Sequence, residues 1–265
     1  MALAITTQPQ SQAVNIGEDV DFSVVAESVV EYGNGNLKWN EDGHWVTDKG
    51  TINEYDNTLE CIGDSRGHYP LSLVNAFKYI YVEYENNSSS YSNSYIFRNL
   101  GASTTDRISV WGESSQYKIT CRDNGVNDDV VIPTGKLIDD IVSIGCNFLD
   151  NDTTDVNVKV TRSIANGGAV VIDYNHNTPT PRLELCYPTV ANFDSTSTYT
   201  SFIMIKHISY QWKKDTVDIP TKTDSTLSLT SDIFTSCISI KILALESTIL
   251  TGISFTASQS LSSVR

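Results

Sequence analysis

A short segment near the C-terminal end of the chain, residues 208–215, places the strongest constraint on the fold. It reads Ile-Ser-Tyr-Gln-Trp-Lys-Lys-Asp, so that Tyr210 and Trp212 alternate with polar Gln211 and Lys213. Side chains that alternate in this way lie on opposite faces of a β-strand, here one aromatic face and one solvated face. The charged residues that follow indicate a tight turn. The segment therefore predicts a strand of an antiparallel sandwich with its aromatic face buried.

This aromatic-x-Trp strand resembles strand C of an immunoglobulin-like sandwich, in which the tryptophan fills the core. Later strands of that fold have counterparts downstream, at residues 224–230, 237–244 and 252–257. Earlier strands have counterparts at the other end of the chain, at residues 5–14 and 17–26. The resemblance implies one immunoglobulin-like β-sandwich, made of residues 1–28 and 206–265. A second β-sandwich domain, residues 29–205, is inserted between its strands B and C, since sandwich loops tolerate insertions.

The cysteine pair that bridges strands B and F in antibody domains has no counterpart here, because Val24 and Ile240 stand at those places. Five cysteines occur without any C-x-x-C pair, at positions 61, 121, 146, 186 and 237. An odd number argues against a disulfide framework. We therefore expect free, buried thiols, no disulfide, and folding in a reducing cytoplasm.

Composition narrows the class of protein further. Hydrophobic residues make up 40% of the chain and charged residues 19%, and 13 tyrosines accompany long runs of Ser, Thr and Asn, which favours an all-β protein. The net charge of −14 has the wrong sign for binding nucleic-acid phosphates. No apolar run reaches membrane-spanning length and no signal peptide is recognisable, so we expect neither membrane anchoring nor export.

The inserted region reads as a series of short strands joined by turns. The clearest strands are expected at 59–62, 76–84, 95–98, 107–111, 117–121, 156–160, 169–174, 182–186 and 201–207. Residues 138–149 fit both strand and helix patterns, and the β-branched content together with Gly145 favours a strand. Residues 123–129 are expected to form a turn. The number of strands fits a jelly roll.

The end of the inserted region resembles the last strand of jelly-roll carbohydrate-binding modules. The similar residues are 181–190 followed by 195–199. Such modules are common on phage tail and capsid proteins, so the resemblance implies a bacteriophage virion protein. Three tryptophans in the inserted region are candidate platforms for sugar rings, namely Trp39, Trp45 and Trp111, although most sandwich tryptophans belong to the core.

An enzymatic alternative arises from four short motifs that occur in the order typical of GDSL/SGNH hydrolases. Gly63-Asp-Ser65 resembles the nucleophile block and Asp173-Tyr-Asn-His176 the block that holds the base. Gly101 and Asn127 would then supply the oxyanion-hole donors. The expected strands between the motifs argue against this family's doubly wound sheet, and each motif is also a common turn composition.

Two acidic segments offer oxygen atoms to Ca²⁺, with Asp123 and Asp128 in the first and Asp150 and Asp152 in the second. Neither matches a complete calcium loop, so solvated acidic turns are the simpler interpretation. The four histidines show no metal-ligand spacing, and we expect neither a metal nor a cofactor.

The sequence therefore predicts a non-enzymatic structural protein of a phage virion, a capsid decoration or tail-associated protein. We expect it to be made in the host cytoplasm and displayed on the virion surface. Expected partners are other virion proteins, further copies of the chain, and host-surface glycans bound weakly by the inserted domain. An esterase or deacetylase acting on surface glycans is the first alternative. A bacterial cell-surface adhesin is the second, and the lack of a recognisable export signal argues against it.

Overall fold

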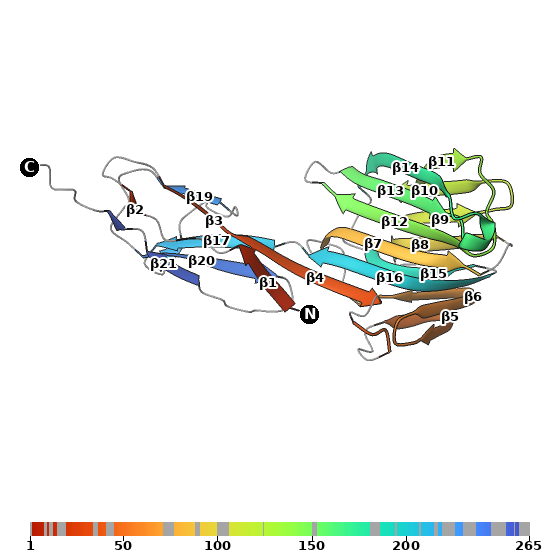
Figure 1. The fold of residues 1–265 in the computed structure, drawn as a ribbon, viewed down its shortest axis with the longest axis horizontal. Helices are drawn as coiled ribbons and strands as arrows, with labels where there is room; N and C mark the ends of the chain where they lie inside the picture. The colour runs from red at the N-terminus through yellow and green to blue at the C-terminus, as the bar shows by residue number, and fades with distance from the viewer. Residues whose placement is uncertain are drawn as a thin grey trace, which may run out of the picture. The chain divides into compact units, whose positions relative to one another are not determined.

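The computed structural model describes most of residues 2–259, and the thin grey trace in Figure 1 marks the remainder. The positions outside the description are 1, 8–9, 11–12, 15–19, 34–36, 41–44, 71–76, 88–90, 100–105, 124, 150–152, 181–185, 194, 207, 215–216, 219–225, 230–236, 245–252, 257 and 260–265. The chain divides into two compact units, Met1–Val29 with Lys206–Arg265 (unit 1) and Val30–Ile205 (unit 2).

Nearly all regular structure in unit 2 is antiparallel β-strand. The strands are β4 (Val25–Gly33, which begins in unit 1), β5 (Val46–Glu54), β6 (Leu59–His68), β7 (Phe77–Asn86), β8 (Ser92–Asn99), β9 (Arg107–Gly112), β10 (Tyr117–Asp123), β11 (Val126–Ile132), β12 (Asp140–Phe148), β13 (Thr153–Thr161), β14 (Val170–Pro179), β15 (Cys186–Asn192) and β16 (Thr196–Lys206). A three-residue 3₁₀ turn, Ile164–Asn166, is the one helical element among the described residues, and no helix there could cross a membrane.

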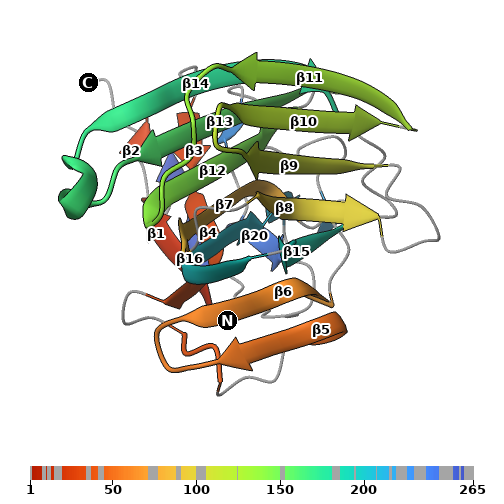
Figure 2. The same cartoon turned by 90° about the vertical axis from the view of Figure 1, so that its right-hand side faces the viewer.

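These strands form one long sheet that folds over into two layers, as in a jelly roll. The strand order is β11-β10-β9-β8-β15-β6-β16-β7-β12-β13-β14, with β5 paired to β6. Strand β15 makes the corner, because Cys186–Pro188 pair with β8 and Thr189–Asn192 pair with β6. Figure 2 shows β8 to β11 as one layer and β7, β12, β13 and β14 in the other. The curled sheet brings its two end strands, β11 and β14, to the same edge.

Strict alternation along the strands builds the core between the layers. Strand β13, for example, buries Thr154, Val156, Val158 and Val160 and exposes the residues between them. The buried cluster continues through β12 and the opposing strands β9 and β10. The thiols of Cys61, Cys121, Cys146 and Cys186 are all buried free thiols within strands. Burial raises the pKa of the Cys61 thiol to about 12, which keeps it protonated and unreactive.

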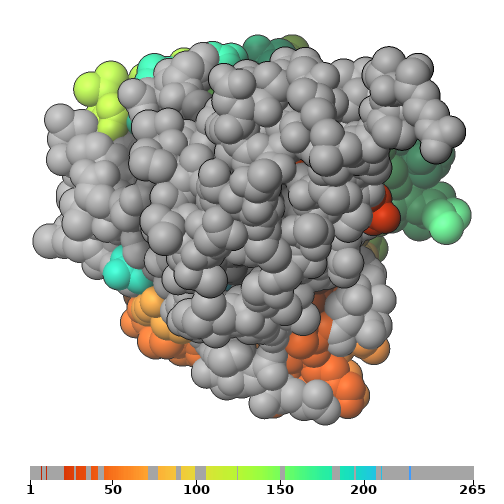
Figure 3. Space-filling model, turned by 90° about the vertical axis from the view of Figure 1, so that its left-hand side faces the viewer, coloured from red at the N-terminus to blue at the C-terminus, as the bar shows by residue number. Residues whose placement is uncertain are grey.

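Unit 1 consists of short strands that form one four-stranded sheet and two strand pairs among the described residues, and its first strand pairs with β4. The strands are β1 (Ala2–Thr7), β2 (Ala13–Val14), β3 (Val20–Ser23), β17 (Ile208–Lys214), β18 (Val217–Asp218), β19 (Thr226–Leu229), β20 (Cys237–Ala244), β21 (Ile253–Thr256) and β22 (Ser258–Gln259). Strand β3 pairs with β19, β17 lies between β18 and β20, and β2 pairs in parallel with β22. Many side chains of this unit, including that of Trp212, lie outside the described residues. Figure 3 draws residues of uncertain placement in grey.

The structure confirms the all-β class and several individual strands, among them the ambiguous segment 138–149, which contains β12. Two expectations for the inserted region were wrong. The strand that was expected to end at Gly63 continues to His68, because Gly63, with φ +62°, carries the chain through an irregularity without ending β6. The expected turn over 123–129 is mostly strand β11.

Candidate binding site

The hairpin formed by β10 and β11 creates the rim of a pocket. The two strands pair from Tyr117 with Ile132 to Asp123 with Val126. Only Asn124 and Gly125 connect them, and Gly125 has φ +83°. An Asn-Gly pair favours the left-handed backbone that a two-residue hairpin needs. The tight connection places Asp123 and Val126 directly opposite each other at the end of the hairpin.

The pocket lies where this hairpin meets the end of β14, and its volume is about 330 Å³. The residues that line it are Cys121, Arg122, Asp123, Val126, Asn127, Asp128, Thr178 and Pro179. Figure 2 shows β11 and β14 next to each other at this edge of unit 2. The volume is at the lower end of the roughly 300–1,000 Å³ typical of small-molecule sites.

Hydrogen bonds hold the polar wall of the pocket in place. The Nε2 atom of His176 on β14 lies 2.8 Å from Oδ2 of Asp128 on β11, and this contact joins the two layers. The Nε atom of Arg122 donates a hydrogen bond to the carbonyl oxygen of Gly125 at 3.2 Å. Among the described residues, the buried Oδ1 atom of Asp123 has no hydrogen-bond partner. Since buried polar atoms are nearly always paired, this oxygen has unused acceptor capacity next to the pocket.

The other walls of the pocket are apolar and chemically inert. Val126 is 73% exposed, and Pro179 stands across from the hairpin on β14. Burial raises the pKa of the Cys121 thiol to about 12, with the charge of Asp128 adding to the effect. A neutral thiol is a poor nucleophile, so Cys121 contributes surface and no covalent chemistry. The site offers acceptors, donors and a small apolar surface, which suits binding.

Two of the three predicted sugar platforms are part of the core, so the prediction was wrong for Trp39 and Trp45. Trp39 is fully buried and its ring centroid lies 5.6 Å from that of Trp45 and 5.0 Å from that of Tyr32. Trp45 also packs against Phe202 at 5.0 Å. These rings gain more from burial against one another than from exposure, because aromatic side chains carry large apolar areas.

Trp111 is half-buried on the outer side of β9, but other side chains contact its ring. The Arg107 guanidinium lies 5.8 Å and the Lys118 ammonium 5.5 Å from the ring centroid. The ring of Tyr91 lies edge-on at 5.4 Å, and the indole nitrogen donates to Ser109 Oγ at 3.0 Å. Trp111 is therefore held in a row of cations and aromatic rings, and it remains a candidate platform only at its exposed edge.

The hydrolase motifs do not converge among the described residues. Ser65 is fully buried in β6 opposite Asn192, whereas Asp173 and His176 lie on β14. Strands β16, β7, β12 and β13 separate β6 from β14 in the sheet, a path of roughly 24 Å at the usual strand spacing. Asn127 belongs to the pocket on β11, and Gly101 lies outside the described residues. Gly63-Asp-Ser65 and Asp173-Tyr-Asn-His176 lie within strands β6 and β14 and form no turns.

The four predicted calcium ligands do not form one site among the described residues. Asp123 and Asp128 both line the pocket, but Asp128 is already bonded to His176. Asp150 and Asp152 lie outside the described residues. In the part of the chain that the structure describes, no group of three or more His, Cys, Asp or Glu side chains is arranged to hold a metal ion.

The sequence singled out Asp123, Asn127, Asp128 and His176 for other roles and did not indicate the pocket. The first three residues line it, and His176 contacts it through Asp128. The Asn124-Gly125 pair between two polar-apolar alternations was an available signal for the hairpin. No local signal indicated that Thr178 and Pro179 complete the wall, because their contact with β11 depends on how the sheet curls.

We expect replacement of Ser65 by alanine to leave hydrolysis of p-nitrophenyl acetate unchanged. The hydroxyl is buried and its strand does not approach His176, so no activated nucleophile is lost. Initial rates of wild type and Ser65→Ala, measured side by side, provide the check. Turnover by the wild type that disappears in the variant would establish the hydrolase alternative.

Comparison with known proteins returns distant structural similarities only. No family model and no curated protein matches the sequence. A carbohydrate binding module, CBM66 of Bacillus subtilis, is 12% identical with a TM-score of 0.41, over 61% of this chain and 95% of that one. The protein SO2946 of Shewanella oneidensis is 10% identical with a TM-score of 0.45, over 74% of this chain and 90% of that one. The Caenorhabditis elegans galectin LEC-6 is 9% identical with a TM-score of 0.34, over 63% of this chain and 99% of that one. Similarities at this level carry no inference about what this protein binds.

Proposed function

We propose that unit 2 is a non-catalytic binding module for neutral glycans and that the β10–β11–β14 pocket is its site. The observation that carries the proposal is the chemical mixture at the pocket. Carboxylate and amide oxygens accept hydrogen bonds from sugar hydroxyls, while the Arg122 guanidinium and the Asn127 amide donate to them. The apolar surfaces of Val126 and Pro179 match the C–H faces of a sugar ring.

Charge favours a neutral ligand over an acidic one. Two carboxylates, those of Asp123 and Asp128, line the pocket together with Arg122, and the whole chain carries a net charge of −14. An anionic ligand would meet repulsion both at long range and within the site. A hydroxyl-rich neutral ligand pays no such cost, and its hydroxyls can donate hydrogen bonds to the carboxylates that line the pocket.

We expect Asn127→Ala and Asp123→Asn each to weaken glycan binding by about 10- to 100-fold, since a lost hydrogen bond to a charged or buried group costs about 1.5–3 kcal/mol. Asn127 is exposed and Asp123→Asn conserves size, so both variants should fold. The measurement is a glycan array to find a ligand, followed by titration calorimetry with each variant.

Asn175→Ala is the matched control for this experiment. Asn175 is also an exposed amide on an outer strand, and it does not line the pocket. Its Oδ1 atom accepts a hydrogen bond from Nδ2 of Asn157 at 2.8 Å. It should bind as well as the wild type. Absence of any glycan binding at millimolar concentration, or equal losses in Asn175→Ala and Asn127→Ala, would contradict the proposed site.

The finer proposal is that the protein decorates a phage virion, on the capsid or the tail, with unit 1 as an immunoglobulin-like sandwich split by unit 2. The strand pairings of unit 1 support the immunoglobulin-like part of this proposal. Strand β3 pairs with β19 as strand B pairs with E, and β20 lies between β17 and β21 as strand F lies between C and G. Detection of the chain in purified phage particles by mass spectrometry, and its position in a density map of the particle, test it.

A further inference from the structure

Three buried polar side chains at one end of the unit 2 sandwich carry atoms that lack partners among the described residues. Lys136 is 2% exposed, and Asn86 and Asp140 are fully buried. The unpaired atoms are the ammonium nitrogen Nζ of Lys136, both Oδ1 and Nδ2 of Asn86, and Oδ1 of Asp140. A buried amine, a buried amide and one buried carboxylate oxygen without hydrogen bonds are each costly, and finding all three in one region requires an explanation.

The backbone brings Asn86 and Asp140 together. Asn86 ends β7, Asp140 begins β12, and the two face each other as cross-strand partners. The amide of Asp139 donates to the carbonyl oxygen of Asn86 at 2.6 Å, which fixes this end of the strand pair. Directly paired side chains in antiparallel strands have Cβ atoms roughly 5 Å apart. The side chains of Asn86 and Asp140 therefore enter the interior next to each other.

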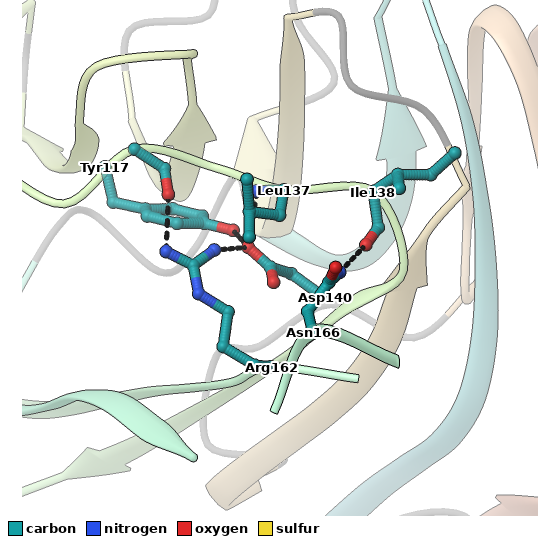
Figure 4. A network of polar contacts seen from close by, with 7 residues as sticks. Tyr117, Leu137, Ile138, Asp140, Arg162 and Asn166 are labelled. Atoms are coloured by element: carbon teal, nitrogen blue, oxygen red, sulfur yellow. Dashed lines mark hydrogen bonds and ion pairs between the residues drawn. The ribbon is translucent and has the colours of Figure 1, made fainter. Parts of the chain in front are cut away.

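Lys136 enters the same end of the sandwich along the opposing layer. Its backbone amide donates to the carbonyl oxygen of Glu113 at 2.8 Å. Its side chain passes close to Gly112, where a Cβ atom would come within 2.7 Å of the Lys136 Cδ atom. Gly112 is the cross-strand partner of Tyr117, whose hydroxyl donates to Oδ2 of Asp140 at 2.7 Å. Figure 4 shows Tyr117 and Arg162 directed at this carboxylate. The lysine stem thus lies beside the tyrosine that reaches across to Asp140.

The state of these groups favours reaction between them. Burial lowers the pKa of the Lys136 ammonium to about 8, with the nearby charge of Asp140 acting in the opposite direction. A sizeable fraction of the amine is then neutral and nucleophilic near neutral pH. Oδ2 of Asp140 already accepts from Tyr117, Arg162 and the Leu137 amide, which leaves Oδ1 to carry a proton.

We propose that Lys136 and Asn86 form an intramolecular isopeptide bond, assisted by Asp140. Nζ of Lys136 attacks Cγ of Asn86, the new Nζ–Cγ bond forms, and the Cγ–Nδ2 bond breaks. Oδ1 of Asp140 accepts the proton from Nζ and delivers it to the departing Nδ2, which leaves as ammonia. The carboxylate ends as it began, no oxidant or other reactant is needed, and the atoms balance as amine plus amide giving a substituted amide plus ammonia.

Such a bond would join β7 to the segment between β11 and β12, and it would not depend on the redox state of the compartment. It is independent of the proposed glycan site, whose residues lie on the β10–β11 hairpin and β14. The covalent link would make the region where β7 pairs with β12 more resistant to unfolding. The four buried thiols form no disulfide that could do the same.

Intact mass spectrometry of the full-length wild-type chain tests the proposal. We expect the mass to fall short of the sequence mass by one ammonia. After reduction, denaturation and trypsin digestion, a branched peptide should join residues 79–98 to residues 123–159, with cleavage blocked at Lys136. Lys136→Arg and Asn86→Ala should both show the full sequence mass, and this readout does not require that either variant folds.

Two controls separate the isopeptide bond from other losses of ammonia. Asn192→Ala changes another fully buried asparagine and should retain the mass deficit. A cyclic imide at one of the Asn-Gly pairs also loses ammonia, but it gives no branched peptide and opens at alkaline pH. A wild type with the full sequence mass, or a deficit that persists in Lys136→Arg without the branched peptide, would overturn the proposal.

Discussion

Replacing Trp39 with alanine should destabilise unit 2 by about 3–5 kcal/mol, the range found for large aromatic deletions in a core. The indole is fully buried and packs against the rings of Tyr32, Trp45 and Phe202, the last at 6.4 Å. Truncation leaves a cavity in a close-packed cluster, which the surrounding rings refill only in part. Urea denaturation followed by circular dichroism gives the free energy of unfolding.

Trp111→Ala is the control for this prediction, since it removes the same side chain from a half-buried position on the outer side of β9. It should cost clearly less, because Trp111 is only half-buried and its ring lies against the charged ends of Arg107 and Lys118. Equal losses for the two variants would show that Trp39 is not the core residue that its packing indicates.

Replacing Asp140 with alanine should also cost about 3–5 kcal/mol, as expected when one member of a buried ion pair is removed. The carboxylate accepts from Tyr117 at 2.7 Å, from Arg162 at 2.5 Å and from the Leu137 amide at 2.8 Å (Figure 4). Its loss leaves a guanidinium and a hydroxyl without their partner in the interior. The network also ties the segment before β12 to the Asn166 side chain, which donates to the Ile138 carbonyl oxygen at 2.8 Å.

Asp129→Ala provides the comparison for Asp140→Ala. Asp129 pairs with Lys118 at 2.8 Å on the outer face, where both side chains are about one quarter exposed, 28% and 27%. Solvent screens such a pair, so its removal should cost no more than about 1 kcal/mol. Thermal and urea unfolding give the free energy of unfolding of both variants. A similar loss of stability in Asp129→Ala and Asp140→Ala would contradict the assignment of the buried network.

Much of the fold could be predicted from the sequence because strand alternation is a local property. Residues 156–160 alternate apolar and polar side chains, and they lie within β13. The all-β class follows from the same pattern repeated along the chain. Where turn-forming residues interrupt the alternation the prediction was wrong: Gly63-Asp-Ser65 resembles a turn, yet the chain stays in β6 because neighbouring strands supply its hydrogen-bond partners.

The candidate site was decided by tertiary structure. Asp128 and His176 are 48 residues apart, and each alone resembles a solvated polar residue. They meet because the long sheet curls until its two end strands share an edge, and this depends on the twist and the corner at β15, which no short stretch of sequence encodes. Likewise, the aromatic character of Trp39 was evident, but its burial depends on which strands pack around it. The sequence by itself determined which residues form strands and which face of each strand is apolar, whereas the partners across each face were decided only when distant strands came together.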